Sequence, residues 1–421
     1  LNILAGVGLI LLLNSIAVRR GLPPGLSALM MVLIVVFSST ISLTMLGMEH
    51  LLHVFLFILF IDRGSVALDK DKGYLFPLIL APFVGGIRYE GLFVVIALVL
   101  LMLYRRKWWW AVGTLIAGFI PAVIVGYASH VHGWPVVPSS LMTKTGIQSY
   151  NTMRGLARLL INFAYQTATT PAIWPAFIPL IIPVLLHIRT KRLTGYGFYF
   201  SGLVLLTLFA HMHTAQVGWL HRYEAYLIAG GIAALFLTTT KEILPKPGTI
   251  LRKLLILALA FACVLAVFKS ADNYRDLYKA QSNIYRQQYQ TGRFLQKYYP
   301  NSVVVINDIG APSLLTDIQL IDPYGLASKE FISVTWKDTA QYNAEMLRLA
   351  DSLKPDVAIL YSHFRSTLPW ERAGALGLEH NWICAEESVI FLAPNPEDLP
   401  MLREHFREFT DSLPDGIIIR P

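Results

Sequence analysis

The sequence predicts a polytopic α-helical membrane protein that is followed by a C-terminal α/β domain. Of its 421 residues, 55% are hydrophobic and 15% are charged. An ordinary soluble domain has about 25% charged residues, so this chain is too apolar to belong to that class. Apolar stretches fill residues 1–270, whereas most of the acidic residues lie in 271–421. We therefore expect a transmembrane helical domain over 1–270 and an aqueous α/β domain over 271–421.

The membrane domain is expected to contain about ten spans, since a helix needs about 20 apolar residues to cross the hydrocarbon. Some stretches are short, and Pro77 and Pro82 interrupt one of them, which favours helices that are half-buried in a bundle. In 152–165, the leucines at helical spacing predict a further helix that lies in the outer interface. The expected spans are 2–18, 25–40, 49–61, 74–87, 91–104, 108–128, 171–188, 196–212, 222–238 and 252–269.

Positive charges occur at every second gap between these stretches. Lys and Arg are retained on the cytoplasmic side of a bilayer, so the alternation predicts a multi-pass protein of the bacterial cytoplasmic (inner) membrane. It also places both ends of the chain, and with them the C-terminal domain, outside the cytoplasm. The clusters are Arg19-Arg20, Arg63/Lys70/Lys72, Arg105–Lys107, Arg189/Lys191/Arg192 and Lys241/Lys246/Arg252/Lys253.

The chain begins within an apolar stretch, without an initiating Met and without the pattern of a cleavable signal peptide. A first span that runs from outside to inside usually follows earlier segments. We therefore expect the chain to be N-terminally truncated.

From residue 271 onwards, short β-branched runs alternate with amphipathic stretches. Such alternation predicts a small, mostly parallel sheet with helices packed against it. The expected strands are 303–306, 319–321, 357–361 and 388–393, and the expected helices are 275–299, 342–353 and 396–411.

Charged and polar residues lie at the predicted outer ends of several spans. Charges at membrane depth are costly, and they usually face a cavity or pair with one another. Taken singly, each could also snorkel or cap a helix, but together they favour a shared cavity on one side of the membrane. The residues are Glu49, Arg88, Glu90, Lys144, His221 and Arg222.

The signs of these charges indicate the chemistry of such a cavity. Its cationic residues, Arg88, Lys144, His221 and Arg222, suit a phosphate or pyrophosphate, and arginine offers bidentate bonds. Glu49 and Glu90 could orient a sugar hydroxyl, act as a base, or pair with those cations.

Metal, redox and nucleic-acid sites are not predicted. The pairs His130/His132 and His211/His213 have a spacing that points the two rings to different sides of a helix, which favours local hydrogen bonding over metal binding. No metal ligands are assigned, although a divalent metal stays open as a cofactor. Cys263 and Cys384 offer no disulfide framework. Much of the net charge of +8 comes from the Lys and Arg residues of the predicted cytoplasmic loops. The sequence has no stripe of basic residues with interleaved aromatics, so no nucleic-acid partner is expected.

Two secondary candidates lie in the C-terminal domain. Asp308 follows the strand 303–306 directly, where ligands commonly bind at the carboxyl edge of an α/β sheet. Asp322 follows the next strand. Asn, Asp and Gly also close strands for purely local reasons, so turn chemistry stands as the alternative for both residues.

Several short motifs occur in an order that resembles a known family, the bacterial GT-C-fold glycosyltransferases that use polyprenyl-phosphate sugars. The similarity favours the arabinofuranosyl- and mannosyltransferase-like branch. The motifs are Gly47-Met48-Glu49, Arg88-Tyr89-Glu90-Gly91, Gly133-Trp134-Pro135-Val136-Val137-Pro138-Ser139-Ser140 with Lys144-Thr145-Gly146, His221-Arg222-Tyr223, Asn307-Asp308-Ile309-Gly310 with Thr316-Asp317, and Ile321-Asp322 with Gly325-Leu326.

This resemblance implies an inverting transfer of a sugar from a polyprenyl-phosphate donor to a glycan or glycolipid acceptor outside the membrane. Glu49 and Glu90 are then the catalytic candidates. The family's catalytic acid usually lies in the first large outer loop, after the first span, and no residue here matches it. Two other functions stay open: a transporter or flippase for a lipid-linked saccharide, and a non-catalytic partner in a cell-envelope assembly.

Overall fold

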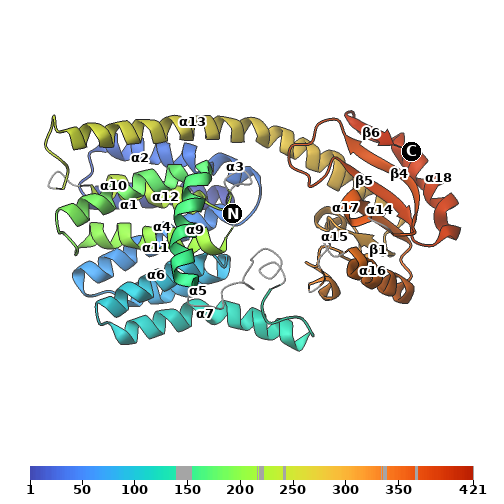
Figure 1. Cartoon of the computed structure of the whole chain (residues 1–421), viewed down its shortest axis with the longest axis horizontal. Coiled ribbons are helices and arrows are strands. Elements are labelled where there is room, and N and C mark those ends of the chain that lie inside the picture. Colours follow the sequence, from blue (N-terminus) through green and yellow to red (C-terminus); the bar gives the residue numbers. More distant parts are fainter. Residues whose placement is uncertain are drawn as a thin grey trace. The chain divides into compact units, whose positions relative to one another are not determined.

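The computed structural model describes residues 1–138, 154–215, 217, 222–239, 243–332, 334, 339–365 and 368–420. Its contacts divide the chain into two compact units (Figure 1). Unit 1 comprises Leu1–His132 and the later residues up to Tyr274, and unit 2 comprises the chain from Arg275 together with a segment that begins at Gly133. The expected boundary after residue 270 lies a few residues before the end of unit 1.

Unit 1 is helical, as expected for apolar stretches whose backbone groups must be satisfied within each segment. Most of its helices follow the apolar stretches closely. They are α1 (Asn2–Arg19), α2 (Pro24–Phe37), α3 (Thr40–Met45), α4 (His50–Lys70), α5 (Leu75–Ile87), α6 (Gly91–Tyr104), α7 (Trp108–Val131), α9 (Arg154–Thr169), the 3₁₀-helix η2 (Pro171–Ile173), α10 (Trp174–Arg189), α11 (Tyr196–Thr214), α12 (Ala225–Thr238) and α13 (Ile250–Ile284).

Within the described part of the chain, five helical segments are long and apolar enough to cross a membrane, and several shorter apolar helices accompany them. Large apolar side chains such as Ile3, Val123 and Leu257 are exposed, which suits a surface that faces lipid. The structure is therefore compatible with a membrane protein, and the number of spans stays a prediction. The five segments are Asn2–Arg19, His50–Lys70, Trp108–Val131, Pro171–Arg189 and Ile250–Tyr298.

Helix α4 is longer than the expected stretch 49–61 because its first acidic residue is neutralised inside the unit. Asp62 is fully buried. It accepts hydrogen bonds from Arg19 Nη2 at 3.0 Å and from Tyr196 Oη at 3.1 Å. A buried charge with such partners can remain within a helix, so α4 continues to Lys70. Asp62, which directly follows the expected stretch, therefore does not end the helix but makes tertiary contacts with α1 and α11.

Helix α4 also lies at the centre of unit 1, where it packs against α1, α5, α6, α11 and α12. Its Phe57 and Phe60 are fully buried. Helix α12 is buried along almost its whole length, and it approaches α10 closely at Gly231, where a Cβ atom would lie 2.3 Å from the carbonyl oxygen of Ala176. Glycine is therefore required at that crossing.

The last helix of unit 1 does not end at the expected stretch 252–269. Helix α13 continues into a π-helical turn, η3 (Tyr285–Tyr289), and then into α14 (Gln290–Tyr298) (Figure 1). The helix expected at 275–299 is thus the far end of one continuous helical segment. Polar residues replace apolar ones along it, but no Pro or Gly separates the two parts.

Unit 2 contains a six-stranded sheet of order β2-β1-β3-β5-β4-β6. The four expected strands agree with the structure in their bounds. The expectation of a mostly parallel sheet is wrong, since β1 pairs in parallel with β2 and β3 but the other three pairings are antiparallel. The strands are β1 (Val303–Ile306), β2 (Gln319–Ile321), β3 (Val357–Tyr361), β4 (Glu371–Leu378), β5 (Ser388–Ala393) and β6 (Ile417–Arg420).

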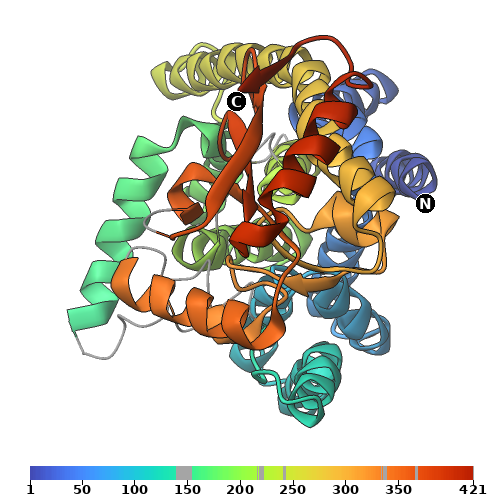
Figure 2. The ribbon, with the colours of Figure 1, turned by 90° about the vertical axis from the view of Figure 1, so that its right-hand side faces the viewer.

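Helices cover this sheet and complete the core of unit 2. Helix α18 lies along β4 and β5, as Figure 2 shows in red. Phe294 on α14 packs edge-on against Phe391 on β5 and Phe409 on α18. The remaining helical elements are α15 (Gly310–Leu315), η4 (Lys329–Phe331), α16 (Thr339–Leu353), α17 (Ser362–Arg365), η5 (Pro396–Asp398) and α18 (Leu399–Thr410).

Candidate functional site

The first part of the site is the N-terminal end of α4. Gly47 has a φ of +71°, a conformation that favours glycine and that turns the chain just before Glu49. Glu49 is the N-cap residue of the helix. His50 and His53 follow, three residues apart and therefore on one face, and both are only 2% exposed. This end of α4 thus presents one carboxylate and two buried imidazoles.

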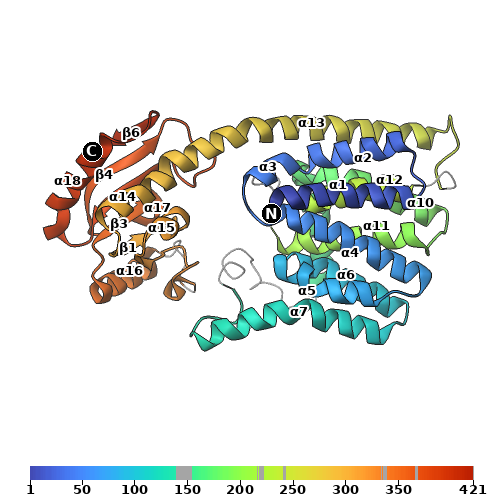
Figure 3. The ribbon, with the colours of Figure 1, turned by 180° about the vertical axis from the view of Figure 1, so that it is seen from behind.

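The second part is the corner between α5 and α6, which lie side by side with α4 (Figure 3). Helix α5 ends at Ile87, Arg88 has an extended backbone, and Glu90 is the N-cap residue of α6. The corner is tight at Gly91, where a Cβ atom would lie 1.9 Å from the carbonyl oxygen of Val84. Only glycine fits there, and this close packing fixes the positions of Arg88 and Glu90.

Arg88 joins these two parts through its guanidinium. Its Nη2 donates to Glu90 Oε1 at 2.7 Å, and its Nη1 forms an ion pair with Glu49 Oε1. The same Nη1 lies 3.3 Å from His50 Nε2. Only 13% of the Arg88 side chain and 16% of the Glu90 side chain are exposed, compared with 37% for Glu49. Charge-assisted bonds that are shielded in this way hold the ends of three helices together.

Arg222 and Tyr223, which precede α12, extend the group. Arg222 Nη2 donates to Tyr223 Oη at 2.8 Å. The guanidinium carbons of Arg222 and Arg88 lie 4.8 Å and 5.9 Å from the centre of the Tyr223 ring. The His50 ring meets the same ring edge-on at 6.3 Å. We call the set Glu49, His50, Arg88, Glu90, Arg222 and Tyr223 the Arg88 cluster.

A second, fully buried layer lies against the Arg88 cluster. The Tyr226 hydroxyl lies 2.9 Å from His211 Nδ1, and the Tyr226 ring packs against the His53 ring at 4.6 Å. Sequence reasoning considered His211 only as half of a metal pair and Tyr223 only as part of a short motif, and it missed His50, His53 and Tyr226. The i, i+3 spacing of two histidines directly after Glu49 was the signal that could have indicated a polar helix end.

The structure thus brings four of the predicted site residues together: Glu49, Arg88, Glu90 and Arg222. Lys144 and His221 lie outside the described residues. Among the residues that the structure describes, no group of three His, Cys, Asp or Glu side chains could hold a metal ion. His211 contacts Tyr226, and the His213 ring packs against Phe209 at 4.6 Å.

In unit 2, the carboxylate of Asp322 organises the turn after β2. Its oxygens accept hydrogen bonds from the backbone N–H groups of Tyr324, Leu326 and Ala327 at 2.7–2.9 Å. Asp322 is fully buried, and Gly325 within the turn has a φ of +84°. These contacts are the local turn chemistry that the sequence left as one of two interpretations.

Asp308, at the end of β1, belongs instead to a polar network between three segments. Its Oδ2 accepts hydrogen bonds from Gln288 Nε2 on η3 at 3.0 Å and from Tyr361 Oη on β3 at 3.3 Å. Gln288 Nε2 also lies 3.4 Å from Cys384 Sγ. Burial raises the pKa of the Cys384 thiol to about 11, so this cysteine is protonated at neutral pH and has little nucleophilic character.

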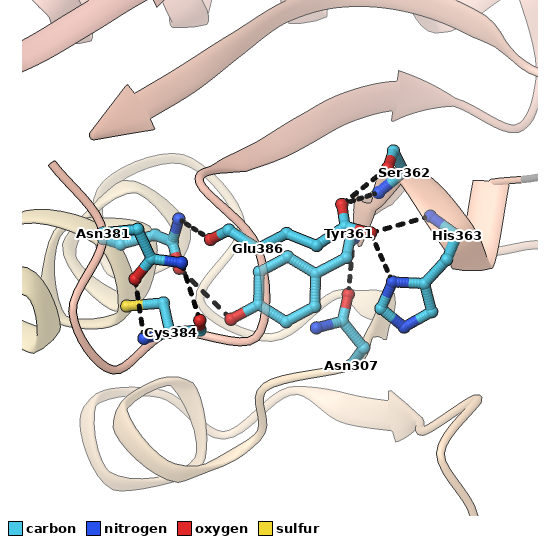
Figure 4. Close-up of polar contacts among 8 residues, drawn as sticks. Asn307, Tyr361, Ser362, His363, Asn381, Cys384 and Glu386 are labelled. Atoms are coloured by element: carbon cyan, nitrogen blue, oxygen red, sulfur yellow. Dashed lines mark hydrogen bonds and ion pairs between the residues drawn. The ribbon is translucent and has the colours of Figure 1, made fainter. Parts of the chain in front are cut away.

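Glu386 fastens the start of α17 beside this network (Figure 4). Its Oε2 accepts from the backbone N–H and the hydroxyl of Ser362, each at 2.6 Å, and its Oε1 lies 2.5 Å from His363 Nδ1. The serine, histidine and glutamate do not form a nucleophilic triad, because the hydroxyl bonds to the carboxylate and not to the imidazole.

We expect Glu386 to make the stability of the protein depend on pH. Burial alone would raise the pKa of this carboxyl, but the hydrogen bonds from Ser362 and His363 bring it below its usual value of 4.5. The stabilisation is therefore complete above pH 4.5 and is lost as the pH falls through the lower pKa of the folded state. Thermal unfolding of the wild type and Glu386→Gln should differ most near neutral pH and converge in acid. A constant difference between pH 3 and pH 7 would contradict this assignment.

Comparisons with known proteins concern unit 2. A family model described as a domain of unknown function, DUF8728, matches residues 281–399. This range includes η3, the Asp308 network and Glu386. No curated protein and no solved structure matches the chain. Function is therefore inferred from the geometry of the two units.

Proposed function

We propose that the chain is a GT-C-type membrane glycosyltransferase. It transfers a sugar from a polyprenyl-phosphate donor to a glycan or glycolipid acceptor outside the bacterial cytoplasmic membrane. The observation that carries the proposal is the Arg88 cluster, in which two guanidiniums and two carboxylates meet at the ends of apolar helices. A lipid-linked sugar combines an anionic phosphate, a polar sugar and an apolar chain, and this cluster with its apolar surroundings suits all three.

Donor binding exchanges partners around Arg88. In the structure, Glu49 and Glu90 occupy the guanidinium, which is mostly shielded from solvent. Phosphate oxygens accept bidentate bonds of the same kind, so a bound phosphate replaces one of the carboxylates. The released carboxylate then lies next to the sugar of the donor, where it can orient a hydroxyl or accept a proton.

The transfer step follows from this arrangement. A carboxylate of the cluster accepts the proton of the acceptor hydroxyl, whose oxygen bonds to the anomeric carbon of the donor sugar. The bond between that carbon and the phosphate oxygen breaks on the opposite side, which inverts the configuration. Polyprenyl phosphate leaves with the electron pair, and Arg88 and Arg222 stabilise its charge.

Transfer by the full-length protein tests the proposal. In proteoliposomes that contain a radiolabelled polyprenyl-phosphate sugar and a glycolipid acceptor, we expect Arg88→Gln to lower the rate of transfer by about 100-fold or more, since it removes a preorganised charge. Arg19→Gln is the matched control, because it also breaks an ion pair with α4, but at Asp62, which keeps Arg63 at 3.6 Å. This control should stay within a few-fold of the wild type.

Two results would overturn the proposal. One is unchanged transfer by a folded Arg88→Gln protein. The other is movement of the donor across the bilayer by the wild type with no new glycosidic bond, which would instead identify a transporter for a lipid-linked saccharide. Such a transporter also needs charges at the ends of its helices, but it has no evident use for a separate α/β unit.

The proposal also places unit 2 outside the cytoplasm. The last basic cluster, Lys241–Lys253, precedes one apolar stretch before the C-terminal unit begins, so that unit should lie on the opposite side from the cluster. Alkaline phosphatase fused after residue 421 should be active in cells, whereas a green fluorescent protein at the same position should stay dark. Bright fluorescence with an inactive phosphatase would reverse the assigned topology.

A further inference from the structure

The sheet of unit 2 has a point at which its strand order reverses. Strand β1 lies between β2 and β3, and all three are parallel. The chain therefore crosses to one side of β1 to form β2 and then to the other side to form β3. In open α/β sheets, ligands bind at the carboxyl ends of the strands at such a reversal. Here, Asn307 and Asp308 end β1, and Tyr361 ends β3.

A narrow recess of about 10 Å³ lies at this edge. A space of that size takes one water molecule or one hydroxyl group of a larger ligand. Its polar lining comes from the end of β1, from the π-helical turn η3 and from the start of α14. The polar lining residues are Gln287, Gln288, Thr291, Asn307 and Asp308.

The turn η3 supplies two buried amides to this edge. Gln287 and Gln288 are 1% and 6% exposed. Gln287 Oε1 accepts from Tyr361 Oη at 3.1 Å, and Gln288 Nε2 donates to Asp308 Oδ2 at 3.0 Å. A π-helical turn is rare and occurs frequently at functional sites. The amides thus hold the Tyr361 hydroxyl and one oxygen of Asp308.

One donor and one acceptor remain available beside the recess. Asn307 Oδ1 accepts from the backbone N–H of Tyr361 at 2.8 Å, as Figure 4 shows. Asn307 Nδ2 and Asp308 Oδ1 have no hydrogen-bond partner among the residues that the structure describes. An amide donor and a carboxylate acceptor on adjacent lining residues match a hydroxyl group, which both donates and accepts.

The charges near the recess narrow the class of ligand. Among the described residues, no Lys or Arg lines the recess, and Asp308 would repel an anion. No metal-binding group occurs in the described part of the chain. We propose that this edge of unit 2 binds a neutral polyhydroxyl ligand, such as a sugar, with one hydroxyl in the recess. That hydroxyl donates to Asp308 Oδ1 and accepts from Asn307 Nδ2. Unit 2 alone forms this site, so the inference does not rest on the proposed transferase activity.

Saturation-transfer-difference NMR on the full chain in nanodiscs tests the site, with D-mannose, D-arabinose and methyl phosphate as probes, because the method detects carbon-bound protons of the ligand. We expect signals from at least one of the sugars and none from methyl phosphate. Asp308→Asn keeps an acceptor for Gln288 and Tyr361 but loses the charge, and it should weaken sugar binding by about tenfold, as for the loss of a charged hydrogen bond. Asn307→Asp keeps the acceptor for the Tyr361 N–H but removes the donor, and it should have a similar effect.

The control is Asp356→Asn at the opposite edge of the same strands, where Asp356 Oδ2 accepts from the N–H of Val303 at 3.0 Å. It should bind sugar like the wild type. The idea is wrong if neither sugar gives a signal, which would leave the recess as the site of a structural water. It is equally wrong if Asp308→Asn and Asn307→Asp both bind sugar as the wild type does while their melting curves show that they are folded. These experiments measure sugar binding and not sugar transfer, so this proposal and the transferase proposal can fail separately.

Discussion

Replacing Glu90 by glutamine in the full-length protein is expected to abolish sugar transfer while leaving the protein folded and inserted. Glu90 is the more shielded of the two carboxylates that hold Arg88, with 16% of its side chain exposed compared with 37% for Glu49. Glutamine keeps the shape and one acceptor oxygen, but it can neither take a proton nor balance the guanidinium. Loss of a positioned acid or base typically costs about 10²–10⁴-fold in rate.

The folded state should tolerate this change. Glu49 continues to pair with Arg88, and the new amide oxygen can still accept the Arg88 Nη2 hydrogen bond. We therefore expect a loss of only about 1 kcal/mol in the free energy of unfolding. Melting in detergent and membrane insertion should resemble the wild type, so a loss of transfer would report on chemistry and not on folding.

Glu49→Gln is the matched comparison. It removes the same charge from the same guanidinium, but at a more exposed position, and transfer should fall less than for Glu90→Gln. If Glu90→Gln transfers sugar at the wild-type rate, Glu90 is only a helix cap that favours the N-terminus of α6 by about 0.3–1 kcal/mol. If Glu49→Gln is the more damaged variant, the roles of the two acids are reversed.

The sequence predicted those strands that local residue patterns determine. The β-branched runs 303–306 and 357–361 end at turn residues, and their strands have the expected bounds. Strand β4 was not predicted because ERAGALGL contains two glycines and no β-branched residue. It forms because β5 and β6 pair with it on both sides. The amino-acid composition of the segment does not indicate such long-range pairing.

The candidate site could be predicted only in outline, for a similar reason. Charges at the ends of apolar stretches pointed to Glu49, Arg88 and Glu90, since membranes rarely tolerate such residues without partners. The pairing of Arg88 with Glu49, 39 positions apart, depends on how α4 and α5 pack. His53 and Tyr226 were missed because, in a sequence, a polar ring among apolar residues resembles an ordinary core position.

Gly91→Ala should disrupt the Arg88 cluster without changing any charged residue. The added Cβ would lie 1.9 Å from the carbonyl oxygen of Val84, a backbone atom that cannot rotate away, and 2.7 Å from its carbonyl carbon. Either α5 or α6 must shift, and Glu90 directly precedes this contact. Overpacking of this kind typically costs about 1–3 kcal/mol, and a shift of about 1 Å between catalytic groups can cost about 100-fold in rate.

Gly113→Ala separates this effect from a general sensitivity of glycines in helices. Gly113 lies in the interior of α7, where a Cβ atom would meet only Leu78 Cδ1 at 3.4 Å, an ordinary contact. Alanine also favours the helix by up to about 1 kcal/mol, so this variant should melt at or slightly above the wild-type temperature and transfer sugar normally. Gly91→Ala should melt lower and transfer little. Equal melting and equal transfer for the two variants would mean that the α5–α6 corner does not position Arg88 and Glu90.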